Sequence, residues 1–178
     1  MSKTERLLAA DEVARRVDAV ADALATRLRP DAVAVCLLTG GLWFAADLTR
    51  ALYARGLDLA FDALWLASYG DAQTTSGRVS VRAGLQRDVA GRQVLIIDDV
   101  LDTGLSLEAA AKIVADAGAA EVITCVFARK ALAETRGGRC DFAAWEAPER
   151  YLTGYGMDMS GRGRGRPDIV ALDVDPGL

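Results

Sequence analysis

The chain has 178 residues, of which 52% are hydrophobic, and carries a formal net charge of −4 at pH 7, so we expect one soluble domain over residues 1–178. No apolar run approaches the roughly 20 residues that cross a bilayer, and the N-terminal residues are too charged for a secretory signal, which indicates a cytoplasmic protein without membrane contact. The absence of histidine excludes the commonest general base and zinc ligand, and the acidic balance argues against nucleic acid as a partner.

The first third of the chain shows two helix-then-strand patterns. Apolar residues at helical spacing predict a helix over residues 4–28, which Pro30 ends. Residues 32–38 form a solid apolar run that is typical of a buried strand, and a Thr-Gly-Gly turn leads from it into a helix predicted over residues 42–56. A further strand is expected over residues 59–67, and a polar loop follows it.

The rest of the chain continues this alternation. The alternating apolar pattern at residues 79–85 indicates that the polar loop extends into a hairpin. Residues 94–97 predict the most buried strand, residues 106–118 a helix, and residues 121–128 and 141–147 two more strands. Because strands alternate with helices and most strands are solid apolar runs, we predict an α/β fold with a central parallel sheet and helices on both faces.

Three carboxylates, of Asp98, Asp99 and Asp102, follow the most buried strand. In open parallel sheets, ligands bind beyond the carboxyl ends of the strands. Residues 103–106 begin a helix whose backbone amides favour a phosphate, although the nearby carboxylates would repel it. The two signals agree if a divalent metal and sugar hydroxyls meet the acids while a phosphate occupies the loop. The plainer alternative is that Asp102 is an N-cap and its two neighbours are solvated.

The stretch VLIIDDVLDTGLSL, at residues 94–107, resembles the phosphoribosyl pyrophosphate (PRPP) signature of type I phosphoribosyltransferases. This motif is specific for the superfamily but says little about the base. Three further stretches resemble the hypoxanthine-guanine phosphoribosyltransferases, and they are LLTGGLWFAADLTRAL (37–52), ASYGDAQTTSGRV (67–79) and the segment 149–173, which contains GYGMD. All four lie in the order found in that family.

The resemblance implies the type I phosphoribosyltransferase fold, with a core over about residues 30–130 and a small hood made of the N-terminal helix and residues 140–178. It implies a purine-salvage enzyme that transfers the 5-phosphoribosyl group of PRPP to N9 of a 6-oxopurine, giving IMP or GMP and pyrophosphate. The implied cofactor is Mg²⁺, the implied partners are PRPP and a purine base, and the family suggests a dimer or a tetramer. The preference among hypoxanthine, guanine and xanthine stays open.

The resemblance also implies which residues bind the sugar and its 5′-phosphate. Asp98 and Asp99 match the acids that meet the ribose hydroxyls and the metal, and Asp158 matches an acid near a second metal and the purine 2-position. Asp102 matches a residue near N7 of the purine that is thought to act as general base. The residues that match the 5′-phosphate loop are Asp102, Thr103, Gly104, Leu105 and Ser106.

Two further segments match the parts that bind pyrophosphate and close the site. Arg164 matches an arginine that reaches pyrophosphate, although the loose spacing leaves Arg162 and Arg166 as alternatives. Thr39 stands where many relatives carry lysine, so its loop offers less charge. The pyrophosphate loop, in which the family often shows a cis peptide, comprises Leu38, Thr39 and Gly40, and the mobile flap comprises Ser68 and Tyr69.

The last implied subsite binds the purine. Lys130 matches a lysine that donates to the purine O6, but Ala131 replaces the proline that commonly follows, which leaves Arg129 as an alternative. Tyr151 takes the place of the stacking aromatic residue, and Leu152 is expected to contact the edge of the base through its backbone. Apart from the resemblance, Tyr151 is typical of a core aromatic residue and Lys130 of a surface charge.

Two other functions share parts of this pattern. An RNA-binding pyrimidine attenuation regulator with uracil phosphoribosyltransferase activity has a similar acidic loop, but we would expect a basic RNA-binding face in it. A phospho-acceptor receiver domain also gathers aspartates and a lysine at strand ends, but its acidic pair follows the first strand. The Ser-Tyr-Gly and GYGMD stretches favour the purine enzymes.

Overall fold

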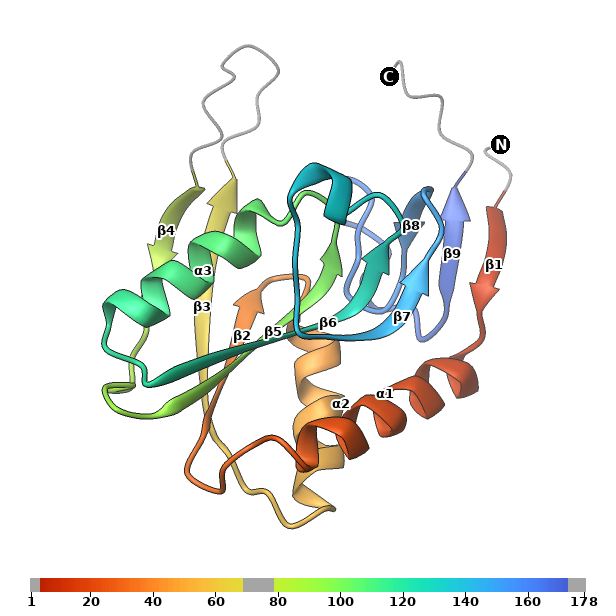
Figure 1. The fold of residues 1–178 in the computed structure, drawn as a ribbon. Coiled ribbons are helices and arrows are strands. Elements are labelled where there is room, and N and C mark those ends of the chain that lie inside the picture. The colour runs from red at the N-terminus through yellow and green to blue at the C-terminus, as the bar shows by residue number, and fades with distance from the viewer. Residues whose placement is uncertain (1–3, 69–78, 173–178) are drawn as a thin grey trace.

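The larger of two sheets forms the centre of the molecule (Figure 1). The computed structural model describes residues 4–68 and 79–172. The six strands of this sheet are, in spatial order, β4 (Val79–Ala83), β3 (Ala60–Ser68), β2 (Val33–Leu38), β5 (Gln93–Leu101), β6 (Glu121–Lys130) and β7 (Phe142–Ala147). Neighbours pair in parallel except for β3 and β4, which form the antiparallel hairpin expected from the sequence.

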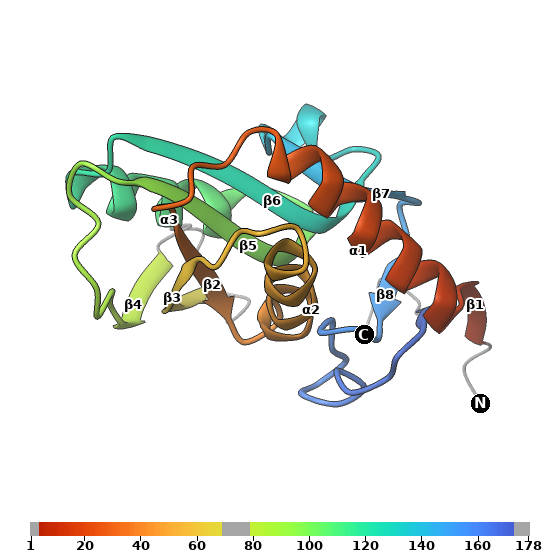
Figure 2. The same cartoon turned by 90° about the horizontal axis from the view of Figure 1, so that it is seen from below.

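Helices cover both faces of this sheet, which confirms the predicted α/β fold (Figure 2). Two helices, α1 (Ala10–Ala25) and α2 (Leu42–Tyr53), pack against each other on one face, and α3 (Leu105–Asp116) covers the other. Side chains of β2 alternate between the two resulting cores, with Cys36 on the side of α1 and α2 and Val35 on the side of α3. A strand that is buried on both faces has no polar side, which explains the solid apolar runs.

The prediction for residues 4–8 was wrong, because they form a strand and not the first turns of a helix. Strand β1 (Thr4–Leu8) pairs antiparallel with β9 (Ile169–Leu172), and β9 pairs with β8 (Tyr151–Thr153) in a second sheet of three strands. Leu7 and Leu8 fit a helical period as well as a strand, so their spacing did not separate the two. The choice depends on a partner strand at the far end of the chain.

This second sheet joins the two ends of the described chain beside the carboxyl ends of the central strands (Figure 1). Helix α1, which we expected in the hood, packs on α2 and on β7 of the larger sheet. The division of residues 1–178 into a core and a hood therefore stays a prediction. Within residues 4–68 and 79–172, no helix is both long and apolar enough to cross a membrane.

The central strand β5 is longer than the four residues expected from its apolar run. Its parallel pairing with β6 continues through Val100, opposite Ala128, and Leu101, opposite Arg129. Asp98 and Asp99 therefore lie inside the end of the strand and not in the loop after it. The backbone hydrogen bonds of this segment are made by the sheet, so polar side chains do not end the strand.

An aromatic cluster on the α2 side of the sheet supplies a test of the core. The buried ring of Phe127 packs edge-on against Phe44, with ring centroids 5.5 Å apart, and against Tyr155 at 4.9 Å. Phe127→Ala should therefore lower the free energy of unfolding by about 3–5 kcal/mol, as measured by urea denaturation. The control Tyr53→Ala, on the exposed face of α2, should change it by less than about 0.5 kcal/mol. A loss below about 1 kcal/mol for Phe127→Ala would contradict this packing.

Candidate active site

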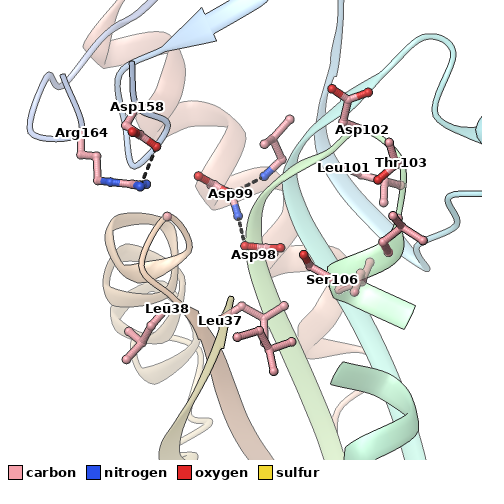
Figure 3. Close-up of a pocket in the computed structure, with 16 residues that line it drawn as sticks. Leu37, Leu38, Asp98, Asp99, Leu101, Asp102, Thr103, Ser106, Asp158 and Arg164 are labelled. Carbon is pink, nitrogen blue, oxygen red and sulfur yellow. Dashed lines mark hydrogen bonds and ion pairs between the residues drawn. The ribbon is translucent and has the colours of Figure 1, made fainter. Parts of the chain in front are cut away.

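A cavity of about 360 Å³ opens at the carboxyl ends of β2 and β5 (Figure 3). This is the position at which ligands bind in open parallel sheets. Three segments that are distant in sequence meet there: the end of β2, the loop between β5 and α3, and the loop after β8. The lining includes Leu38, Gly40, Asp98, Asp99, Asp102, Thr103, Gly104, Leu105, Ser106, Asp158 and Arg164.

Asp98 and Asp99 lie side by side at the floor of this cavity. Asp98 Oδ1 accepts a hydrogen bond from the Asp99 amide at 2.9 Å, and Asp99 Oδ1 accepts one from the Val100 amide at 2.8 Å. Burial and then the negative charge of Asp99 raise the pKa of Asp98 well above its ordinary value, and burial also raises the pKa of Asp99. Two adjacent carboxylates with raised pKa values form a site that favours a cation.

The donor set fits Mg²⁺ better than a metal that requires a complete protein cage. Mg²⁺ is usually held by one or two carboxylates, while water and substrate oxygens supply its other ligands. Asp98 and Asp99 supply such a pair, and among the residues that the structure describes no group of three or more acidic or cysteine side chains is placed to hold a metal ion. Asp158 is held by protein partners in this structure, since Arg164 Nη2 lies 2.6 Å from its Oδ1 and the Gly161 amide donates to its Oδ2 at 2.6 Å. Its expected place near a second metal stays a prediction.

The loop between β5 and α3 presents the start of a helix to the cavity. Gly104 precedes α3 with φ +83°, and a Cβ at this position would lie 2.5 Å from the Cα of Gly138. Glycine is therefore required both by the backbone conformation and by the close contact. No side-chain cap is made at this helix start, so its amides are available to an anion. Thr103, Leu105 and Ser106 complete the expected phosphate loop.

The loop after β2 approaches Asp99 through its backbone. The Leu38–Thr39 peptide bond is cis, as the resemblance implies. A Cβ on Gly40 would lie 1.9 Å from Asp99 Oδ2, and a Cβ on Gly156 would lie 2.2 Å from the carbonyl oxygen of Gly40. Both glycines therefore allow chain segments to meet at the carboxylate. Thr39 is exposed, just outside the lining of the cavity.

A second cavity of about 200 Å³ adjoins the first and shares Asp99, Val100, Asp102 and Asp158 with it. Its other lining residues are Lys130, Tyr151, Leu152 and Met157. The structure thus brings the expected purine-binding residues together. The hydroxyl of Tyr151 donates to the carbonyl oxygen of Asp158 at 3.0 Å, which links the two walls of this cavity.

Asp102 carries ion pairs on both carboxylate oxygens. Lys130 Nζ lies 2.8 Å from Oδ2, and Arg136 Nη1 donates to Oδ1. Partial burial alone would raise the pKa of Asp102, but the hydrogen bond from Lys130 and the charges of Lys130 and Arg136 outweigh it and hold this pKa below its ordinary value. The alternative that Asp102 is a helix N-cap is not what the structure shows, because Gly104 takes the position before α3.

The structure places Arg164 and Arg166, two of the three arginines left open for pyrophosphate, in different surroundings. Arg164 lines the first cavity, and its Nη1 donates to the carbonyl oxygen of Gly156 at 2.6 Å. Arg166 pairs with Asp168 at 3.0 Å, and Arg129 pairs with Glu146 across the β6–β7 edge. Of the two candidates for contact with the purine, Lys130 therefore lines the second cavity and Arg129 does not.

Some site residues were missed, and one expected residue cannot be placed. Leu66, Val100 and Met157 line the cavities, and Arg136 binds Asp102. The sequence gives little indication of these residues, because each is of a common type and meets residues of the site that are distant in sequence. Of the expected flap, Ser68 ends β3 and Tyr69 lies outside the described residues.

The close approach of Gly40 to Asp99 can be tested by adding one methyl group. Gly40→Ala should displace the Asp99 carboxylate or the loop after β2 and lower the free energy of unfolding by about 1–3 kcal/mol. Gly84→Ala is the matched control, because a Cβ there meets nothing within 4 Å. Urea denaturation of both variants measures the difference, and equal stabilities would show that Gly40 does not need to be glycine.

Comparisons with known proteins agree with this geometry. A family model described as a phosphoribosyl transferase domain matches residues 4–137. The chain is 31% identical over 173 residues to the hypoxanthine-guanine phosphoribosyltransferase of Aquifex aeolicus (strain VF5), covering 96% of each chain. It is 32% identical over 145 residues to the enzyme of the same name from Mycobacterium avium, covering 80% of this chain and 69% of that one.

Solved structures give the same result. A point mutant of the Trypanosoma cruzi hypoxanthine phosphoribosyltransferase, in a ternary complex with substrates, superposes with a TM-score of 0.87 at 28% identity, covering 96% of this chain and 95% of that one. The same enzyme in complex with IMP gives a TM-score of 0.84 at 28% identity, covering 96% and 94%. The chain therefore belongs to the phosphoribosyltransferase family and, within it, to the group of the hypoxanthine-guanine phosphoribosyltransferases.

Proposed function

We propose that this protein is a purine-salvage phosphoribosyltransferase that transfers the 5-phosphoribosyl group of PRPP to N9 of hypoxanthine or guanine, giving IMP or GMP and pyrophosphate. The observation that carries this proposal is the pair of adjoining cavities that share Asp99 and Asp102. One has acids and a helix start, which suit a phosphorylated sugar, and the other has a lysine and an aromatic ring, which suit a purine. The substrate and IMP complexes of the structural relatives support the same assignment.

The sugar would lie in the first cavity. The amides and hydroxyls of residues 103–106 would bind the 5′-phosphate at the start of α3. Asp98 and Asp99 would hold Mg²⁺, which when bound supplies neutralising charge to the ribose hydroxyls and the leaving pyrophosphate. Arg164 lies on the opposite wall and would contribute a second positive charge to pyrophosphate. The Gly40 loop would offer it backbone amides in place of a lysine side chain.

The purine would lie in the second cavity. Lys130 would donate to the 6-oxo group, the ring of Tyr151 would stack on the base, and the backbone of Leu152 would contact its edge. When the bond from C1′ to pyrophosphate breaks, its electron pair leaves with pyrophosphate. N9 of the purine forms the new bond to C1′, and Asp102 takes the proton from N7. Asp102 can take this role because its pKa, held below the ordinary value by Lys130 and Arg136, leaves the carboxylate ionised at neutral pH, and because it borders both cavities.

Two further properties are proposed on the resemblance alone. We expect the protein to act in the cytoplasm, where PRPP and purine bases are its partners. We also expect a homo-oligomer, either a dimer or a tetramer. Sedimentation or light scattering of the purified protein measures the second of these directly.

The proposed function is tested by a spectrophotometric assay with PRPP, Mg²⁺ and each of five bases. Hypoxanthine or guanine should be converted, and turnover should stop when EDTA removes the metal. Adenine should not be converted, because its 6-amino group cannot accept a hydrogen bond from Lys130. Turnover of uracil, with no turnover of hypoxanthine, guanine or xanthine, would support the attenuation regulator in place of the purine enzyme.

The role of Asp102 is tested by Asp102→Asn, which keeps the shape of the side chain but removes the basic oxygen. We expect kcat to fall by about 10²- to 10⁴-fold, while KM for PRPP changes much less. Asp116→Asn is the control, since Asp116 forms an exposed pair with Lys112 on α3. An unchanged kcat in Asp102→Asn would remove this residue from the proton transfer.

A further inference from the structure

Arg136 is a charged residue that contacts the active site and has no role in the proposed function. It ends the short 3-10 helix η1 (Glu134–Arg136), in the connection between β6 and β7. Its Nη1 donates to Asp102 Oδ1, and its Nη2 lies 2.8 Å from Glu149 Oε1. The same glutamate accepts a hydrogen bond from the Leu132 amide at 3.3 Å through its other oxygen. Arg136 therefore joins the phosphate loop to the segment that leads into β8.

The connection that carries Arg136 also supports the phosphate loop through its backbone. Gly104 lies so close to Gly138 that a Cβ on Gly104 would be 2.5 Å from the Gly138 Cα. The Gly138 amide in turn donates to the carbonyl oxygen of Ala133 at 2.9 Å, which closes the turn around Arg136. The guanidinium group is thus held on a turn that is itself packed against the loop containing Asp102.

The two cations on Asp102 differ in their access to the purine. Lys130 lines the second cavity and lies 2.8 Å from Oδ2, so a 6-oxo group that enters the cavity offers this lysine another acceptor. Arg136 lies outside the lining of both cavities and is tied to Glu149. Lys130 can therefore exchange its hydrogen bond to Asp102 for one to the purine, whereas Arg136 keeps its hydrogen bond to Asp102.

We propose that Arg136 is a positioning residue that holds Asp102 through Oδ1 while Lys130 moves its hydrogen bond from Asp102 Oδ2 to the purine. This inference rests on the proposed function. The freed Oδ2 accepts the N7 proton, and the electron pair of the N7–H bond remains in the purine ring. N9 then supplies the pair for the bond to C1′, and the pair of the broken C1′–O bond leaves with pyrophosphate. Without Arg136, the carboxylate would lose its orientation at the moment Lys130 departs.

The charges around Asp102 predict how the pH dependence of kcat should change when Arg136 is removed. The charged groups nearby are Lys130 from β6, Arg136 from η1, Asp99 on the same strand end, and Asp158, which lines the same cavity and is paired with Arg164. Glu149 partly neutralises Arg136. The positive charge of Arg136 helps to lower the pKa of Asp102. Its removal raises that pKa, so protonation then inactivates the base at a higher pH. The acidic limb of the pH profile of kcat should move to higher pH.

The test compares Arg136→Gln, Arg136→Lys and Glu149→Gln, with hypoxanthine as the base. In Arg136→Gln, kcat should fall by about 10- to 100-fold, with KM for PRPP within about threefold of the wild type, and the acidic limb should shift upward. Arg136→Lys restores the charge, so it should recover part of kcat and return the limb toward its original position. Glu149→Gln weakens the tether but keeps Arg136 and its charge, so it should give a smaller loss of kcat.

A matched control is Arg15→Gln, which removes an exposed arginine that pairs with Asp11 and Glu12 on α1 and should leave kcat unchanged. Circular dichroism establishes that each variant is folded, and if Arg136→Gln does not fold, Arg136→Lys and Glu149→Gln carry the test. The proposal is overturned if kcat stays within about twofold of the wild type with the acidic limb unmoved, or if the loss appears only in KM for PRPP. A wild-type protein that converts no purine would instead overturn the proposed function.

Discussion

The burial of β5 on every side is the constraint on which the site depends. Strands β2 and β6 pair with both of its edges, and apolar cores cover both of its faces. A carboxylate earlier in this strand would be buried without a partner, which costs several kcal/mol. At its carboxyl end the strand opens into a cavity, and Asp98 and Asp99 lie there. The position of the acids therefore follows from the enclosure of the strand that carries them.

Close backbone approach shapes the site as much as long side chains do. Gly40 lies against Asp99, Gly156 lies against the carbonyl of Gly40, and Gly104 lies against Gly138. Each contact joins segments that are distant in sequence, and each leaves no room for a Cβ. These contacts bring the acidic pair, the phosphate loop and the purine cavity within reach of one ligand. Lost glycines would therefore separate the subsites even if every charged group remained.

Paired charges then order the side chains that project into the cavities. Arg164 is fixed by Asp158 and the carbonyl of Gly156, and Asp102 is fixed by Lys130 and Arg136. Asp98 and Asp99 differ from these acids, because burial raises the pKa of both and the charge of Arg164 offsets this only in part at Asp99. This buried pair of acids is suited to a metal ion, whereas Asp102, which has two cations in contact, is suited to remain ionised at neutral pH.

Local patterns were sufficient for most of the fold and for the centre of the site. Solid apolar runs mark strands that are buried on both faces, so the first part of β5 could be read directly, although its extension through Asp98 to Leu101 could not. The acids, Gly104 and the helix start lie within a few residues of one another, so the loop after β5 could be read as well. The strand at residues 4–8, the different surroundings of Arg164 and Arg166, and the contact of Arg136 with Asp102 could not be read in this way. Each depends on a partner that folding brings from elsewhere in the chain, and a spacing pattern contains no information about such a partner.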